Sequence, residues 1–140
     1  MGMFDSLNIS GSGLTAERLR MDLIANNLAN ANTTRTEDGG PFKRQMAIFA
    51  AVESADSLTG QKVGRGVRVV GITEDQSEPR LVYDPQHPDA NSDGYVLMPN
   101  INVVTEMVDL ITATRAYEAN ITAINAAKSM AMKALEIGRG

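Results

Sequence analysis

Apolar residues recur at heptad spacing at both ends of the chain, and this constrains the fold more than any other feature. Near the N-terminus the repeat comprises Leu7, Leu14, Met21 and Leu28, with Ile24 and Ala31 on the adjoining face. Near the C-terminus a longer series follows alternating steps of four and three residues: Val103, Met107, Leu110, Thr114, Tyr117, Ile121, Ile124, Lys128, Ala131 and Leu135. Such spacing places side chains on one stripe of a helix, which a single helix cannot bury. The sequence therefore predicts two terminal helices that need partners.

Glycine and proline residues divide the chain into three regions. Residues 1–34 carry the first repeat and form the predicted N-terminal helix. Residues 100–140 form the second helix, because Pro99 gives a clean start and Gly138 supplies a stop. Residues 35–99 hold most of the glycines and all of the prolines. The predicted fold class is α+β, with long terminal helices pairing as a coiled coil and a small β-rich segment inserted between them.

The middle region predicts short strands. Runs that alternate in hydrophobicity, or are rich in β-branched residues, lie at 45–53, 67–72, 81–83 and 95–98. Gly71 predicts a β-bulge, and the segment 64–66 predicts a hairpin turn. Residues 54–64 are expected to form a mobile loop. Together these features predict one small antiparallel β unit.

The composition excludes several classes of function. Aromatic residues make up only 4% of the chain, which suits narrow helix–helix seams better than a thick core. The net charge of −4 argues against a general nucleic-acid binder. The absence of Cys removes disulfides, zinc thiolate sites and cysteine nucleophiles. The N-terminus has no cleavable signal pattern and no apolar run reaches the length of a membrane span. We therefore expect a cytosolic chain, or one that leaves the cell without a cleaved signal.

Sequence motifs for metal binding or catalysis are weak in this chain. Residues 89–94 match the first half of an EF-hand loop, but Asn100 replaces the bidentate Glu, so a turn is favoured over a calcium site. His87 is the only histidine and is expected to be an exposed loop residue. Carboxylates on the C-terminal helix are interpreted as solvated or partner-facing charges: Glu106, Asp109, Glu118 and Glu136. No nucleophile is paired with a base, so we expect no enzymatic activity, cofactor, metal or small-molecule substrate.

Two interpretations of the terminal stripes remain open. The simpler one is an intramolecular helical hairpin. The other is assembly, which is favoured because the polar residues Tyr117 and Lys128 lie on the stripe itself. In addition, Val104, Val108 and Ile111 extend the apolar face beyond what one short helix can cover. If the chain assembles, a soluble adaptor that forms a closed dimer is the alternative to an open polymer.

Several segments resemble a known family. Residues 25–33 resemble the N-terminal signature of bacterial flagellar axial proteins, which are the rod, hook and hook-associated subunits. The signature positions are Ala25, Asn26, Asn27, Leu28, Asn30, Asn32 and Thr33. Residues 40–45 are similar to proximal-rod members, and residues 102–111 and 115–120 are similar to the C-terminal helix of the family. Residues 83–90 are similar to one rod member in particular, so the resemblance covers nearly the whole chain.

The resemblance implies a structural role. It implies polymerisation into the proximal rod, a hollow drive shaft that transmits torque and conducts exported subunits. The implied partners are copies of the chain itself, other rod subunits and the export-gate adaptor at the rod base. The implied location is the basal body, in the rod that spans the periplasm, after export by the flagellar type III apparatus without a cleaved signal.

We interpret the terminal stripes as the assembly seam of such a tube. The seam residues are Leu7, Leu14, Met21, Ile24, Leu28, Val103, Met107, Leu110, Tyr117, Ile121, Ile124 and Leu135. Heterologous contacts of this kind build open helical tubes. Two roles are open for Asn26, Asn27 and Asn30: they fix register by hydrogen bonds across helices, or they cap the first helix.

Overall fold

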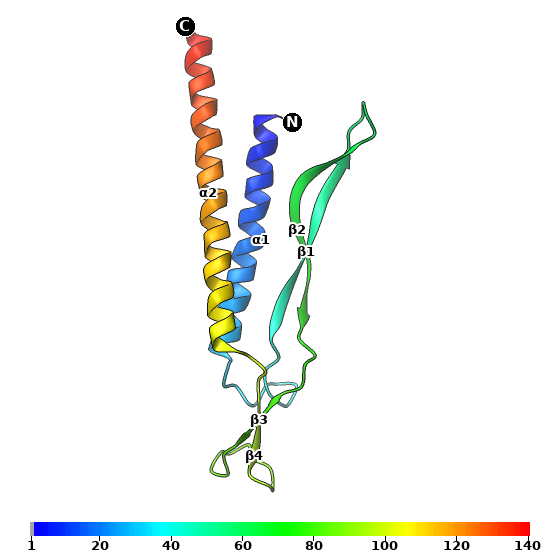
Figure 1. The fold of residues 1–140 in the computed structure, drawn as a ribbon, viewed down its shortest axis with the longest axis vertical. Helices are drawn as coiled ribbons and strands as arrows, with labels where there is room; N and C mark the ends of the chain where they lie inside the picture. The colour runs from blue at the N-terminus through cyan, green and yellow to red at the C-terminus, as the bar shows by residue number, and fades with distance from the viewer. Residues whose placement is uncertain (1) are drawn as a thin grey trace.

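The computed structural model describes residues 2–140 as an elongated molecule of two helices and two β-hairpins (Figure 1). In chain order the elements are α1 (Met3–Ala29), β1 (Gln45–Ala55), β2 (Lys62–Glu74), β3 (Arg80–Tyr83), β4 (Tyr95–Met98) and α2 (Val103–Arg139). The helices are antiparallel and lie side by side, and the β1–β2 hairpin packs along α1. The β3–β4 hairpin lies at the end farthest from the C-terminus. The predicted α+β class is confirmed.

The first helix is shorter than predicted because asparagine ends it. α1 stops at Ala29, where Asn30 Nδ2 donates to the carbonyl of Asn26 at 2.9 Å. The same carbonyl accepts the backbone amide of Asn30 at 3.1 Å, so the side chain adds a second hydrogen bond at the helix end. Residues 30–34, predicted as helix, continue as a turn and an irregular segment.

The second helix starts at a side-chain cap. Asn102 Oδ1 accepts hydrogen bonds from the backbone amides of Val104 (3.1 Å) and Thr105 (3.2 Å). These amides belong to the first turn, whose donors have no partner within the helix. From Val103 onward α2 runs for 37 residues. At 1.5 Å per residue it is about 56 Å long, compared with about 40 Å for α1.

Contacts across the helix pair define its register. Gly13 lies against Asn120, Met21 Sδ is 3.6 Å from Thr114 Oγ1, and Asn27 Nδ2 is 3.4 Å from Glu106 Oε2. Counting outward along both helices places Met3 opposite Met130. Residues 131–139 of α2 therefore extend past the start of α1, by about 13 Å. Figure 1 shows this extension, which we call the C-terminal overhang.

The β-rich segment is two separate hairpins and not the single β unit that was predicted. β1 pairs only with β2, and β3 pairs only with β4, both antiparallel. The first hairpin pairs Ala55 with Lys62, so its turn spans only residues 56–61. The predicted loop at 54–64 is therefore too long at both ends. Backbone hydrogen bonds extend both strands beyond the residues whose side chains alternate in hydrophobicity.

Contact with α1 explains an irregularity in β2. Gly66 lies inside this strand, so the predicted hairpin turn at 64–66 is wrong. Its φ of +111° favours glycine, and a Cβ there would collide with Ser12 Oγ of α1. The same Ser12 oxygen accepts a hydrogen bond from the amide of Val67 at 3.1 Å. The predicted bulge next to Gly71 is present, with Val70 as the extra residue in the register.

The loop between β3 and β4 is a turn that folds back on the segment after α1. Asn91 Oδ1 accepts hydrogen bonds from the amides of Asp93 (3.0 Å) and Tyr95 (2.9 Å), as the turn prediction for residues 89–94 requires. His87 is half-buried, not exposed as predicted, because its Nδ1 accepts the amide of Asp89 at 3.0 Å. The hairpin is thereby held by local bonds and not by a large core.

Candidate assembly interface

A buried carboxylate joins three segments that are far apart in the sequence. Glu106 of α2 is 1% exposed and forms an ion pair with Arg44, which immediately precedes β1. Arg44 Nη2 also lies 3.6 Å from Asp109 Oδ2. Asn27 of α1, also 1% exposed, donates to the other carboxylate oxygen of Glu106. The prediction that Glu106 is solvated or partner-facing is therefore wrong: a buried charge is tolerated because it is paired and hydrogen-bonded.

Two of the signature asparagines have different roles. Asn27 Oδ1 accepts the amide of Gln45, and Asn27 Nδ2 donates to the carbonyl of Gln45, both at 2.9 Å. Asn26 adds a side-chain bond to Gln45 Oε1 at 3.3 Å. Asn30 is the C-cap of α1. Both alternatives considered for these residues thus occur, the cross-helix bond at Asn27 and the cap at Asn30.

The other signature positions make fewer contacts. Thr33 Oγ1 donates to Asn30 Oδ1 at 3.1 Å and continues the cap. Leu28 is half-buried, whereas Ala25 and Asn32 are exposed. The signature therefore contains a buried contact residue (Asn27), the C-cap of α1 (Asn30) and exposed positions.

The predicted seam residues divide between the helix pair and the surface. On α1, Ile24 is buried and the heptad positions are half-buried: Leu7, Leu14, Met21 and Leu28. On α2, half-buried positions are Leu110, Tyr117 and Ile124, and exposed ones are Val103, Met107, Ile121 and Leu135. The exposed residues of α2 are free to contact a neighbouring subunit. Their role as contacts between subunits remains a prediction.

Small residues decide which side of α2 faces α1. The fully buried positions of α2 are Glu106, Ala113 and Ala127, one residue before the predicted 107, 114 and 128. On α1, Gly13 and Ala16 are buried at the crossing. A Cβ at Gly13 would lie 2.8 Å from Asn120 Nδ2, so the backbones approach closely there. Two small residues that lie two heptads apart, Ala113 and Ala127, are the sequence signal for this face of α2.

A large apolar surface of α2 has no partner among residues 2–140. Val104, Val108 and Ile111 are 70%, 55% and 55% exposed, and their spacing puts them on one helix face. We call this group the outer patch. Further along, Met130 is exposed just before the overhang, and the overhang carries three more exposed apolar residues: Met132, Leu135 and Ile137. Exposed apolar surface of this extent marks a contact with another molecule.

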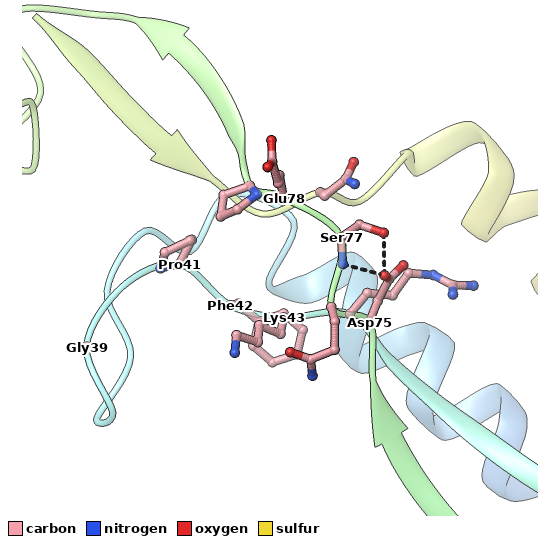
Figure 2. Close-up of a pocket in the computed structure, with 11 residues that line it drawn as sticks. Gly39, Pro41, Phe42, Lys43, Asp75, Ser77 and Glu78 are labelled. Carbon is pink, nitrogen blue, oxygen red and sulfur yellow. Dashed lines mark hydrogen bonds between the residues drawn. The ribbon is translucent and has the colours of Figure 1, made fainter.

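A cavity of about 280 Å³ lies where the hairpins meet the helix pair (Figure 2). Its lining includes Phe42, Lys43, Asp75 and Glu78, which mix apolar and oppositely charged groups. The Ser77 hydroxyl (2.5 Å) and amide (2.9 Å) donate to Asp75 Oδ1 and lower the pKa of that carboxyl. Asp75 thus closes its own turn and is not aimed at a ligand.

The described structure holds no candidate for a metal site or a membrane-spanning helix. Within residues 2–140 no group of three His, Asp or Glu side chains is arranged to hold a metal ion. Neither α1 nor α2 is sufficiently long and apolar to cross a membrane.

Comparison with known proteins agrees with this geometry. Residues 7–35 match the family model described as flagella basal body rod protein. Residues 92–137 match the model for the C-terminal part of flagellar basal body rod FlgEFG proteins. A curated relative from Borreliella burgdorferi, named flagellar basal-body rod protein FlgC, is 50% identical over the full length of both chains. Relatives of the same name from Bacillus subtilis (48%) and Salmonella typhimurium (40%) are matched over 99% of this chain and 100% of their own.

Antiparallel terminal helices, an inserted β-rich segment and both terminal matches define a flagellar axial protein, a class of structural subunits. Sequence identity of 50% and 48% over essentially whole chains narrows this class of axial proteins to one family. The chain belongs to the FlgC family of flagellar basal-body rod proteins, and its function is structural, as a subunit of the basal-body rod. The predicted family and structural function are confirmed.

Proposed function

We propose that this chain polymerises into the proximal part of a hollow rod, which transmits torque and conducts exported subunits. The observation that carries the proposal is the unpartnered apolar surface of α2, namely the outer patch and the overhang. In the outer patch Val104 is 70% exposed, and in the overhang Ile137 is 81% exposed. Within the chain α1 covers only the opposite face of α2, so a further molecule is needed to cover these residues.

The arrangement of the two surfaces supports an open polymer over a closed dimer. The outer patch lies near the start of α2 and the overhang forms its end, so the two apolar groups are far apart along one rod-like helix. A contact that uses different surfaces on the two molecules repeats without closing and builds a tube. Torque would then be shared among many similar helix contacts.

The small core supports export in an unfolded state. Within residues 2–140 the buried hydrophobic residues include four alanines, Ala16, Ala31, Ala113 and Ala127. Such small side chains contribute little transfer free energy, so the free subunit should unfold easily. On this proposal the subunit passes through the type III apparatus without a cleaved signal and reaches the part of the rod that spans the periplasm.

The proposed partners are copies of the chain, other rod subunits and the export-gate adaptor at the rod base. We assign the chain a structural role without enzymatic activity; in the cavity, the Ser77 hydroxyl and amide hold Asp75 within its own turn. The overhang is the element best placed to contact a subunit in the next layer, since it extends beyond α1.

Val108→Asp tests the proposal. Full burial of a valine is worth about 1.5–3 kcal/mol, so covering the 55% of Val108 that is exposed should contribute about 1 kcal/mol per contact. A buried carboxylate without a partner adds a cost of several kcal/mol. We expect cells with this variant to lack complete rods and motility, while the purified subunit keeps its circular dichroism spectrum.

Thr122→Asp is the matched control, because it adds the same charge at an exposed polar position of α2. It should leave motility close to wild type. Complete, motile flagella in Val108→Asp cells, seen by electron microscopy of basal bodies, would contradict assembly through the outer patch. Sedimentation of the purified subunit as a stable dimer that Val108→Asp converts to monomer would favour the closed dimer instead.

A further inference from the structure

The most unusual buried group in the molecule is the ionised cluster between its helices. We define the polar cluster as Asn27, Arg44 and Glu106. Asn27 and Glu106 are each 1% exposed, and the Arg44 side chain is 22% exposed. Removing Arg44 alone would leave the buried Glu106 carboxylate without its ion-pair partner.

Most of the remaining helix interface does not distinguish one register from the next. Besides Glu106, the buried residues of α2 are Ala113 and Ala127, two heptads apart, and the buried residues of α1 include Gly13 and Ala16. Contacts among small apolar side chains are non-directional, and a slip of seven residues brings similar side chains together again. Apart from the contact of Gly13 with Asn120, the packing of the helix pair therefore leaves its register weakly specified.

We propose that the polar cluster is the element that fixes the register of α1 against α2. A slip of one heptad would move Glu106 about 10 Å from Asn27, beyond any hydrogen bond. Asn27 would then face a different residue, and the Glu106 carboxylate would lose one of its partners. Buried polar residues set register in this way in other helix pairs, at some expense of stability.

The cluster also ties the β1–β2 hairpin to the register. Asn27 forms two backbone hydrogen bonds with Gln45, the first residue of β1, and the adjacent Arg44 forms the ion pair with Glu106. A single arrangement of Asn27 and Glu106 thus sets both the helix alignment and the point at which the hairpin starts. Arg44, Asn27 and Glu106 are positioning residues in this sense.

Engineered cysteines provide a direct readout, because the natural chain has none. Met21→Cys with Thr114→Cys reports the native register, since these side chains are in contact at 3.6 Å. Met21→Cys with Met107→Cys, or with Ile121→Cys, reports a slip of one heptad in either direction. The three α2 positions are about 10 Å apart, and a disulfide requires Cα atoms within about 7 Å, so each pair reports one register.

The test compares two sets of substitutions in the full chain. The first, Asn27→Leu/Arg44→Met/Glu106→Leu, replaces the polar cluster by apolar groups that can pack without unpaired charge. The matched control, Asn8→Leu/Lys43→Met/Glu118→Leu, makes similar changes at exposed positions. Glu106→Gln is the conservative variant, which keeps hydrogen-bonding capacity towards Asn27 and Arg44.

The disulfides are formed under equilibrating thiol conditions. In wild type, in the exposed control and in Glu106→Gln, we expect the native-register disulfide to exceed either slipped-register disulfide by about a hundredfold. The reason is that a slip would break the buried contacts of Glu106, which is strongly unfavourable. In the apolar triple variant the shifted disulfides should rise to within about tenfold of the native one, without a lower urea midpoint.

Three outcomes would overturn the proposal. They are a native disulfide that stays dominant in the apolar triple variant, a loss of register in the exposed control, and no native preference in wild type. If the triple variant fails to fold, Arg44→Met/Glu106→Leu, which keeps Asn27 on Gln45, serves for the same comparison and carries the same expectation. Register within one chain does not depend on polymerisation, so the outcome is separable from that of Val108→Asp.

Discussion

Two glycines in α1 are two residues apart, and the structure predicts opposite effects when each is replaced by alanine. No atom lies within 4 Å of a Cβ built at Gly11, so Gly11→Ala meets open space. At Gly13 a Cβ would lie 2.8 Å from Asn120 Nδ2 and 3.0 Å from both Asn120 Cγ and Oδ1. The second substitution therefore requires the Asn120 side chain, or the two helices, to shift.

The magnitudes follow from these contacts. Alanine in place of glycine stabilises a helix interior by about 1 kcal/mol, and Gly11→Ala should gain most of it. Gly13→Ala has the same gain but adds an overpacking cost of about 1–3 kcal/mol. Moving Asn120 aside would also break its 3.0 Å bond to the carbonyl of Ala116, a loss of about 1 kcal/mol. We expect Gly13→Ala to lower the free energy of unfolding by about 1–3 kcal/mol.

Urea titrations followed by circular dichroism at 222 nm measure both variants on the same protein. A third variant, Gly13→Ala/Asn120→Ala, removes the obstructing side chain and should recover most of the lost stability through a positive coupling energy. Equal stabilisation by Gly11→Ala and Gly13→Ala would refute the reasoning. It would mean that the helices do not meet at Gly13 and that the register inferred from this contact is wrong.

Two further predictions concern the assembly seam and the β3–β4 loop. Ile121 is 37% exposed and lies beside the helix pair, so Ile121→Asp should abolish motility while export and the β hairpins persist. The control variant Glu136→Ala should have a mild effect. Motile cells with Ile121→Asp would contradict the prediction that Ile121 belongs to an assembly seam. For Asp89, the Thr34 hydroxyl bond (2.6 Å) lowers its pKa below the ordinary 3.8, and the charge of Arg35 adds to this effect. The tie between this loop and residues 34–35 is therefore present above about pH 3.8 and is lost as pH falls through the lower folded pKa. Carboxyl NMR titration should show Thr34→Val raising that pKa, and an unchanged midpoint would exclude the bond.

Local patterns determined the elements of this protein. Heptad spacing indicated both terminal helices, and alternating or β-branched runs indicated four strands, because side-chain periodicity is a property of each segment by itself. Asn102 before α2 and Asn30 after α1 are likewise local signals, since a cap needs only neighbouring amides or carbonyls. The signature at residues 25–33 also indicated the family without reference to any contact.

Only the tertiary structure decided which faces meet. The stripe of large apolar residues predicted Met107 and Leu135 for the seam, but the close approach at Gly13 selects Ala113 and Ala127 for the helix contact and leaves the larger residues exposed. The burial of Glu106 depends on Arg44, 62 positions away, and on Asn27, 79 positions away. No local pattern encodes such pairs, because the free energy of a buried charge depends on partners that folding brings from elsewhere in the chain.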